Sequence, residues 1–162
     1  MRRLFVLAAL LGLSACKQGE VYDRSFDETM TILKATDVPL HYYGPSHDTD
    51  FVRTTPEPNK VEWKVTLEGK PVMRYVALVE PESDHSTRVT LTLEGIGKTV
   101  EGMKHNPAIA KLYVATMTEA TDSALEARPF DTTRFYPQIA AATMAAARKM
   151  HFPEERTQSG SN

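Results

Sequence analysis

Cysteine is almost absent from this chain: of its 162 residues only Cys16 carries a thiol. A single cysteine cannot form a disulfide within the chain, and it cannot build a metal site that needs several thiolates. The fold must therefore be held together by the packing of its side chains. A small buried residue is the plainest interpretation of Cys16, and only its neighbours argue against that interpretation.

The chain also lacks a strong excess of charge. Its 19 basic and 21 acidic side chains give a net charge of −2, and no run rich in lysine or arginine appears. Nucleic-acid binding normally depends on such a basic patch, so nucleic acid is not expected as a partner. No basic amphipathic helix is present that would hold the protein on an anionic lipid surface.

Apolar runs long enough to span a membrane are absent as well. Arg2 and Arg3 precede an apolar stretch at residues 4–13, and small residues lead from that stretch to Cys16. Ten residues span about 15 Å as a helix, half of the ~30 Å thickness of a hydrocarbon core. Because it is too short to cross a bilayer, the stretch is typical of a secretory signal. We expect residues 1–15 to be a signal peptide that is removed on export.

The tetrapeptide Leu13-Ser14-Ala15-Cys16 resembles the lipobox of bacterial lipoproteins at all four positions. In that family the signal is cut just before the cysteine, whose sulfur receives a diacylglyceryl group and whose new amine is usually acylated. The resemblance implies a lipoprotein that is anchored in a membrane by acyl chains, such as palmitate, on Cys16. Acylation would also leave the mature domain without a free thiol, and hence without a cysteine nucleophile.

Residues 16–20 are then expected to be a short lipidated tether. In well-studied enteric bacteria an aspartate after the lipidated cysteine retains lipoproteins in the inner membrane. This chain has Lys17 at that position. The resemblance therefore implies a periplasmic, lipid-anchored protein of the cell outer membrane rather than of the inner membrane.

The remaining sequence predicts a single α+β domain at residues 21–152 and a disordered polar tail at residues 153–162. Ser25 and Glu28 have the spacing of a capping box, which places the start of a first helix. Residues 40–59 are predicted to be irregular, with short extended pieces near 40–43 and 51–54, because glycine and proline interrupt them. The predicted elements are helices at 26–35, 107–127 and 137–150 and strands at 61–67, 72–80 and 87–94.

The three strands follow one another with short links, which predicts an antiparallel meander. Strand 61–67 alternates apolar and polar residues, so one of its faces should be solvated. Strand 72–80 is apolar on both faces except at Arg74, which indicates a central position. Because a half-apolar sheet must be covered, we expect the helices to lie over one face of the meander.

This layout resembles the helix-grip proteins, the START and polyketide-cyclase-like group. In that group a short strand and a helix precede an antiparallel sheet, and a long late helix lies across its concave face. The segment Val21-Tyr22-Asp23, the helix that follows it, the meander and the helix at 107–127 carry the resemblance. It implies an apolar cavity between sheet and helix for lipids or other hydrophobic molecules. A low strand count and an additional alanine-rich helix depart from the group's pattern.

Six residues are candidates for the lining of such a cavity, three on the strands and three on the long helix. They are Trp63, Tyr75, Val89, Leu112, Tyr113 and Thr116. The alternative is that they simply fill the core, because protein interiors normally pack without voids. Tyr75, Tyr113 and Thr116 add polar groups that a ligand site would use and that a plain core must satisfy.

Metal binding and catalysis have weaker support. The cluster at residues 47–50 holds imidazole and carboxylate groups but sits in a predicted loop without a spaced partner motif, so a solvated turn is the alternative. His85 beside Asp84 has the same alternative. The pairs Met103 with His105 and Met150 with His151 contain soft ligands for copper, although scattered methionines more often fill gaps in a core. No metal or other cofactor is predicted.

No motif of a hydrolase, a zinc protease or a phosphate-binding loop occurs in the chain, so an enzyme would need a site assembled only in three dimensions. The sequence predicts a lipid-anchored, non-enzymatic envelope protein that binds a hydrophobic small molecule or lipid. The alternative is a structural or interaction lipoprotein that holds a protein partner near the membrane.

Overall fold

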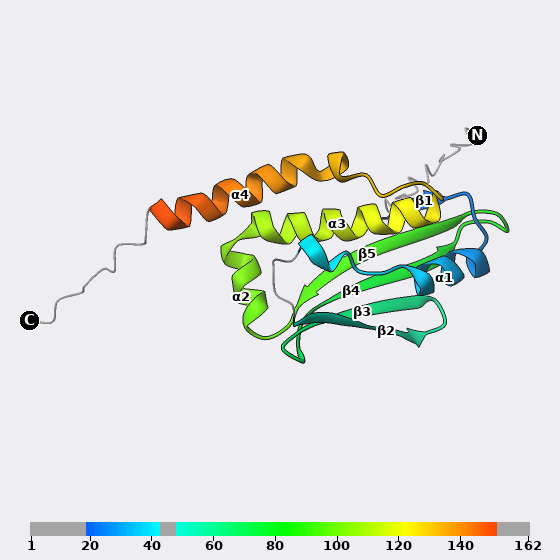
Figure 1. Ribbon diagram of the computed structural model, residues 1–162. Coiled ribbons are helices and arrows are strands. Elements are labelled where there is room, and N and C mark those ends of the chain that lie inside the picture. The colour runs from blue at the N-terminus through cyan, green and yellow to red at the C-terminus, as the bar shows by residue number, and fades with distance from the viewer. Residues whose placement is uncertain (1–18, 43–47, 152–162) are drawn as a thin grey trace, which may run out of the picture.

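The computed structural model of the protein describes residues 19–42 and 48–151. It contains one five-stranded antiparallel sheet with helices packed on one of its faces, an α+β fold as the sequence predicts (Figure 1). The strands are β1 (Glu20–Tyr22), β2 (Thr49–Glu57), β3 (Lys60–Leu67), β4 (Lys70–Pro81) and β5 (Thr87–Gly95). The helices are α1 (Phe26–Ala35), α2 (Lys98–His105), α3 (Pro107–Leu125) and α4 (Tyr136–His151). Two short 3-10 turns, Leu40–Tyr42 and Thr132–Phe135, complete the described elements.

The strands lie in the order β1-β5-β4-β3-β2, so β4 is the central strand. This confirms the prediction made from its apolar character on both faces. Trp63 on β3 is paired with Tyr75 on β4, which in turn is paired with Leu93 on β5. The register therefore brings large side chains of three strands onto one face, because side chains that share a pair position point to the same side.

The two faces of the sheet differ in polarity. Val61, Trp63 and Val65 on β3 are buried, as alternation in the sequence predicts. The other face carries a charged ladder that lies between strands. In it Arg74 bonds Glu94 at 2.6 Å and lies 3.6 Å from Glu62. One face is thus covered by helices, whereas the other is solvated and laced by ion pairs.

The edge strand β2 is longer than predicted. Residues 49–57 form a nine-residue strand, whereas only a short extended piece near 51–54 was expected within an irregular segment. Pro56 argued against a continuous strand here, because proline lacks the backbone N–H donor that strand pairing uses. β2 is an edge strand with a register shift between Thr54 and Glu57, and both features accommodate a proline. The expected extended piece at 40–43 is instead a 3-10 turn at Leu40–Tyr42.

Helix α1 follows its prediction closely. It begins at Phe26 and ends at Ala35, and the Ser25 hydroxyl accepts the backbone N–H of Glu28. The Glu28 carboxylate in turn accepts the backbone N–H of Ser25 at 3.0 Å. This capping box satisfies two backbone donors that no helical carbonyl can reach. The helix then buries Met30 and Leu33 against the sheet.

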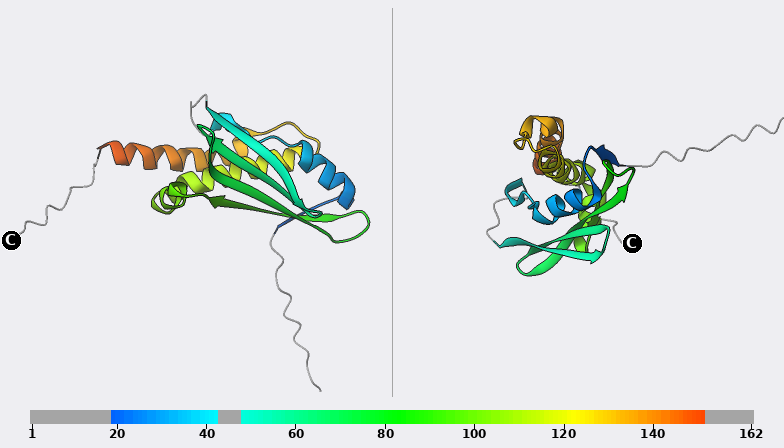
Figure 2. Two further views of the ribbon diagram at one scale, coloured as in Figure 1. Left: turned by 90° about the horizontal axis from the view of Figure 1, so that it is seen from below. Right: turned by 90° about the vertical axis from the view of Figure 1, so that its right-hand side faces the viewer.

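The two long C-terminal helices lie at different depths. α3 runs across the core face of the sheet, and α4 lies on the far side of α3 (Figures 1 and 2). Both helices were predicted, but α4 covers α3 rather than the sheet. Its alanines explain this position, because small side chains let two helix backbones approach closely.

Candidate functional site

An apolar groove lies where the sheet ends, between β3, β4, α2 and the first half of α3. Its volume is about 430 Å³. Sites for small molecules usually measure about 300–1,000 Å³ and are lined mainly by hydrophobic groups. The residues that give this groove its apolar character are Val65, Leu67, Val72, Met73, Met103 and Ile109.

Helix α2 forms one wall of the groove and was not predicted from the sequence. Its position depends on Gly95, where a Cβ atom would lie 2.9 Å from the Val100 nitrogen and 3.2 Å from the Met103 sulfur. Only glycine lets α2 pack this tightly against the last residue of β5. Gly97 then turns the chain into α2 with a φ of 59°, a value that favours glycine.

Polar residues are a minority of the groove's lining. Thr49 comes from β2, Thr99 from α2, and Asn106 from the junction of α2 and α3. The Asn106 side chain makes no capping hydrogen bond to α3, and the residue is buried beside the groove that it lines.

Tyr113 is the predicted ligand-binding residue that lines the groove. Its backbone carbonyl accepts a hydrogen bond of 3.2 Å from the Tyr75 hydroxyl, which connects α3 to β4. Burial raises the pKa of the Tyr113 phenol, which is protonated at physiological pH even without this shift.

The other predicted residues lie elsewhere. Trp63, Tyr75, Val89 and Thr116 are buried, and Leu112 is half-buried on α3. Trp63 packs in the core and donates a hydrogen bond of 2.9 Å to the Thr36 carbonyl. Val89 lines a second hollow beside β1. The structure thus places the groove nearer the end of the sheet than the sequence analysis did.

Three lining residues that sequence reasoning missed lie at or near the end of a strand or helix. Leu67 is the last residue of β3 and has 39% of its surface exposed, Met103 lies in the last turn of α2, and Ile109 lies in the first turn of α3. An apolar residue near the end of a strand or helix was the signal in the sequence that could have indicated a groove, because the element provides no further side chain beyond its end to cover that residue. The periodicity of apolar residues alone assigns such a residue to the buried face of its element.

The metal-ligand candidates lie apart from each other in the described part of the chain. No group of three or more histidine, cysteine, aspartate or glutamate side chains could hold a metal ion among the residues described. Met103 lines the groove, whereas His105 is exposed and its Nδ1 lies 2.7 Å from the Glu101 carbonyl. His85 lies in an exposed loop. His47 and the side chains of Met150 and His151 fall outside the residues that can be described.

The predicted lipidation site, Cys16, also lies outside the described residues. The structure begins at Gly19, whose φ is 114° and whose position leaves no room for a side chain, since a Cβ would lie 2.7 Å from the Val89 carbonyl oxygen. Arg88 donates a hydrogen bond of 3.0 Å to the Gly19 carbonyl. Glu20, assigned to the tether in the sequence analysis, already belongs to β1. The chain is therefore fixed three residues after Cys16.

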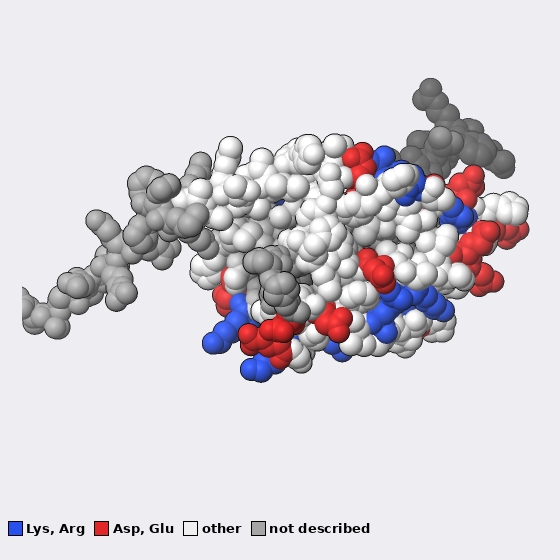
Figure 3. All heavy atoms as spheres, viewed as in Figure 1, with Lys and Arg blue, Asp and Glu red and all other residues white. Residues whose placement is uncertain are grey.

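The surface of the molecule is uneven in charge. Figure 3 shows that charged side chains are missing over the middle of α4 and gather around the sheet. Residues 136–147 contain no charged residue, and Met144 and Tyr136 are exposed on this helix. Within the described ranges, each helix is too short or too polar to cross a bilayer.

Comparisons with known proteins found no match. No family model matches the chain, and no curated protein or solved structure has significant similarity to it.

Proposed function

We propose that this protein is exported and lipid-anchored, and that its domain binds a hydrophobic small molecule or lipid in the groove beside α2. The groove itself is the observation that carries the binding proposal, because it combines a volume of about 430 Å³ with a mainly apolar lining. The anchor follows from the lipobox-like sequence that ends at Cys16. A short strand and helix before an antiparallel sheet, with a long helix after it, support the helix-grip resemblance.

Gly102 offers a sharp test of the groove. It lines the groove from α2, and a Cβ atom at this position would meet no other atom within 4 Å. In Gly102→Leu the new side chain should occupy the groove and reduce the binding of the apolar probe N-phenyl-1-naphthylamine, measured by fluorescence, at least about tenfold, which corresponds to ~1.4 kcal/mol. The helix should not suffer, because replacing glycine within a helix gains about 0.5–1 kcal/mol.

The matched control is Ala140→Leu, which adds the same side chain to an exposed position of α4. It should bind the probe as the wild type does. Circular dichroism of both variants would show whether they are folded. Unchanged probe binding by a folded Gly102→Leu protein would rule out the groove as the binding site.

The uncharged surface of α4 supports the alternative, an interaction lipoprotein that holds a protein partner near the membrane. Met144 is 64% exposed on this surface. Large exposed apolar groups often mark sites of protein contact. A photoreactive residue at position 144 would form crosslinks in whole cells under this alternative, and Gly102→Leu would leave those crosslinks unchanged.

A further inference from the structure

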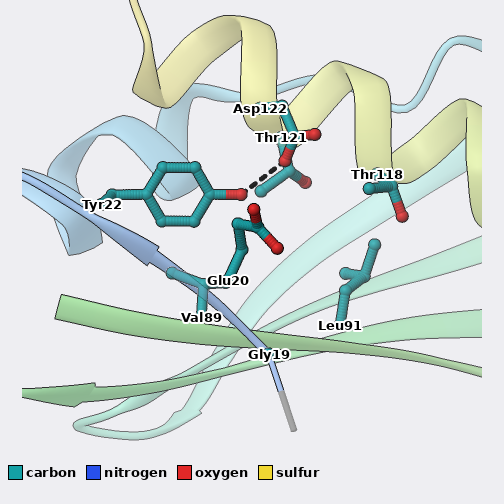
Figure 4. Close-up of a pocket in the computed structure, with 8 residues that line it drawn as sticks. All are labelled: Gly19, Glu20, Tyr22, Val89, Leu91, Thr118, Thr121 and Asp122. Atoms are coloured by element: carbon teal, nitrogen blue, oxygen red, sulfur yellow. Dashed lines mark hydrogen bonds between the residues drawn. The ribbon is translucent and has the colours of Figure 1, made fainter. Parts of the chain in front are cut away.

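A second hollow lies beside the point where the chain enters the fold. It has a volume of about 250 Å³ and is bounded by β1, β5 and the second half of α3 (Figure 4). Its polar lining consists of two carboxylates and three hydroxyl groups, from Glu20, Asp122, Tyr22, Thr118 and Thr121. None of the described residues that line it carries a positive charge. The lining therefore offers many hydrogen-bond acceptors and no cation to neutralise them.

The two carboxylates approach the hollow from different elements. Asp122 projects from α3 and accepts a hydrogen bond from the Tyr22 hydroxyl. Figure 4 shows the Glu20 carboxylate of β1 directed toward the same place. Burial is the main reason that the pKa of Asp122 is raised, and the charges of Glu126 and Glu119 add to it. A bound cation would relieve this unfavourable environment.

Thr121 provides a second, independent observation. Only 2% of this residue is exposed, and its hydroxyl has no hydrogen-bond partner among the described residues. Its side chain points from α3 toward Glu20 in Figure 4. Native proteins rarely leave a buried hydroxyl unpaired, and each such group calls for an explanation. A ligand in the hollow would supply the missing partner.

We propose that this hollow binds a primary ammonium group. The carboxylates of Glu20 and Asp122 supply the negative charge, and the hydroxyl oxygens of Thr121 and Thr118 accept the N–H groups that remain. An ammonium has three donors and no acceptor, which matches a lining made of acceptors. Val89 and Leu91 form an apolar wall for the carbon atoms attached to the nitrogen.

A metal ion fits the same hollow less well. Calcium usually takes six to eight oxygen ligands, with several carboxylates among them. The described part of the chain contains no group of three carboxylate, imidazole or thiolate side chains arranged for a metal. An ammonium needs only three hydrogen-bond acceptors, which two carboxylates and the neighbouring hydroxyl groups can supply.

The place of the hollow suggests two sources for the ammonium group. Gly19 lines the hollow and lies three residues after Cys16, a stretch that spans at most about 10 Å. If Cys16 carries acyl chains, which rests on the proposed lipid anchor, the hollow faces phospholipid headgroups. The ammonium could then belong to a phosphatidylethanolamine headgroup, or to a free small amine.

The first arm of the test does not depend on lipidation. The purified protein is titrated with ethanolamine, and the backbone amide signals of Tyr22 and Thr121 are followed by NMR. Choline is the control, because it carries the same charge but has no N–H donor on its nitrogen. Saturable shifts with ethanolamine and not with choline are expected. Equal responses, no response, or a stronger response to calcium alone would overturn the proposal.

The second arm distinguishes the sources. The protein is bound to nanodiscs of phosphatidylcholine, and half of that lipid is then replaced by phosphatidylethanolamine. If the same amide signals shift, the ligand is the lipid headgroup. If they shift only when free ethanolamine is added, the ligand is a small amine. Failure of the protein to bind either nanodisc would contradict the lipid anchor and leave the first arm valid.

Two variants test the assigned roles. Asp122→Asn and Thr121→Val should each weaken ethanolamine binding about tenfold or more, because each removes a charge-assisted hydrogen bond. Thr121→Val keeps the shape of the side chain and removes an unpaired hydroxyl, so the variant should unfold at the wild-type temperature or above it. Glu101→Gln on α2 is the control and should bind normally. Wild-type affinity in folded Thr121→Val or Asp122→Asn protein would overturn the assignment.

Discussion

Glu119 is a buried carboxylate that joins α3 to the segment that leads into α4. Only 2% of the residue is exposed. Its carboxylate accepts hydrogen bonds from Arg128 at 2.9 Å and from the backbone N–H of Asp131 at 2.7 Å. Burial opposes the charged form, but these donors outweigh it and lower the pKa of Glu119. The residue therefore stabilises the fold in its ionised state.

We expect Glu119→Ala to reduce the free energy of unfolding by about 3 kcal/mol, because it leaves Arg128 and the Asp131 amide without their buried acceptor. Urea unfolding monitored by circular dichroism measures this loss. The control is Glu126→Ala, which removes the exposed partner of Arg128 and should cost about 1 kcal/mol or less.

The lowered pKa of Glu119 also predicts how the stability of the fold depends on pH. A carboxyl whose pKa is lowered by folding contributes stability above its unfolded pKa of about 4.3, and this contribution is lost as the pH falls through the folded value. The difference in stability between the wild type and Glu119→Ala should therefore shrink below about pH 4. Equal losses in Glu119→Ala and Glu126→Ala at neutral pH would contradict the structural role assigned here.

At the scale of single elements, α1 shows the strongest link between local sequence and structure. Its capping box uses only Ser25 and Glu28, which are three residues apart. Ser25→Ala should lower the free energy of unfolding by about 1 kcal/mol, because the backbone N–H of Glu28 loses its acceptor and the Glu28 carboxylate loses the hydroxyl that donates to it. For a domain of this size the loss corresponds to a decrease of about 3–6 °C in the melting temperature. Thermal denaturation followed by circular dichroism would measure it.

Thr31→Ala provides the comparison on the same helix. The Thr31 hydroxyl is exposed and bonds only the Asp27 carbonyl within α1. Since alanine has the higher helix propensity, this variant should be as stable as the wild type or slightly more stable. A loss equal to that of Ser25→Ala would mean that the cap has no special role.

The elements that were predicted correctly are those whose signal lies within the segment itself. Helix α1 has its cap, strands β3 and β5 alternate, and α3 begins at the expected Pro107. Strand β2 was predicted only as a short extended piece at 51–54, because its position at the sheet edge, which tolerates Pro56, is a property of the neighbouring strands. Helix α2 was missed because it is short and depends on close packing against Gly95.

At the scale of the whole molecule, the proposed lipid anchor would determine where the domain works. Cys16→Ser should abolish incorporation of a labelled fatty acid, and an unprocessed precursor should accumulate on immunoblots. Two or more acyl chains anchor a protein stably, since each buried methylene contributes about 0.8 kcal/mol, whereas the variant has none on this residue. Lys17→Ala should still be labelled. Processing and labelling of Cys16→Ser as in the wild type would contradict the lipoprotein proposal.

The sequence by itself determined the fold class, the central place of β4, the solvated face of the sheet and the start of α1 and α3. Each of these follows from residues close together in the chain, because periodicity and capping act over a few positions. Only the tertiary structure decided where the concave sites lie. The groove joins Leu67, Met103 and Ile109, and the acidic hollow joins Glu20 to Asp122. Such residues are far apart in sequence, and they become neighbours only when β1 pairs with β5 and α3 crosses the sheet.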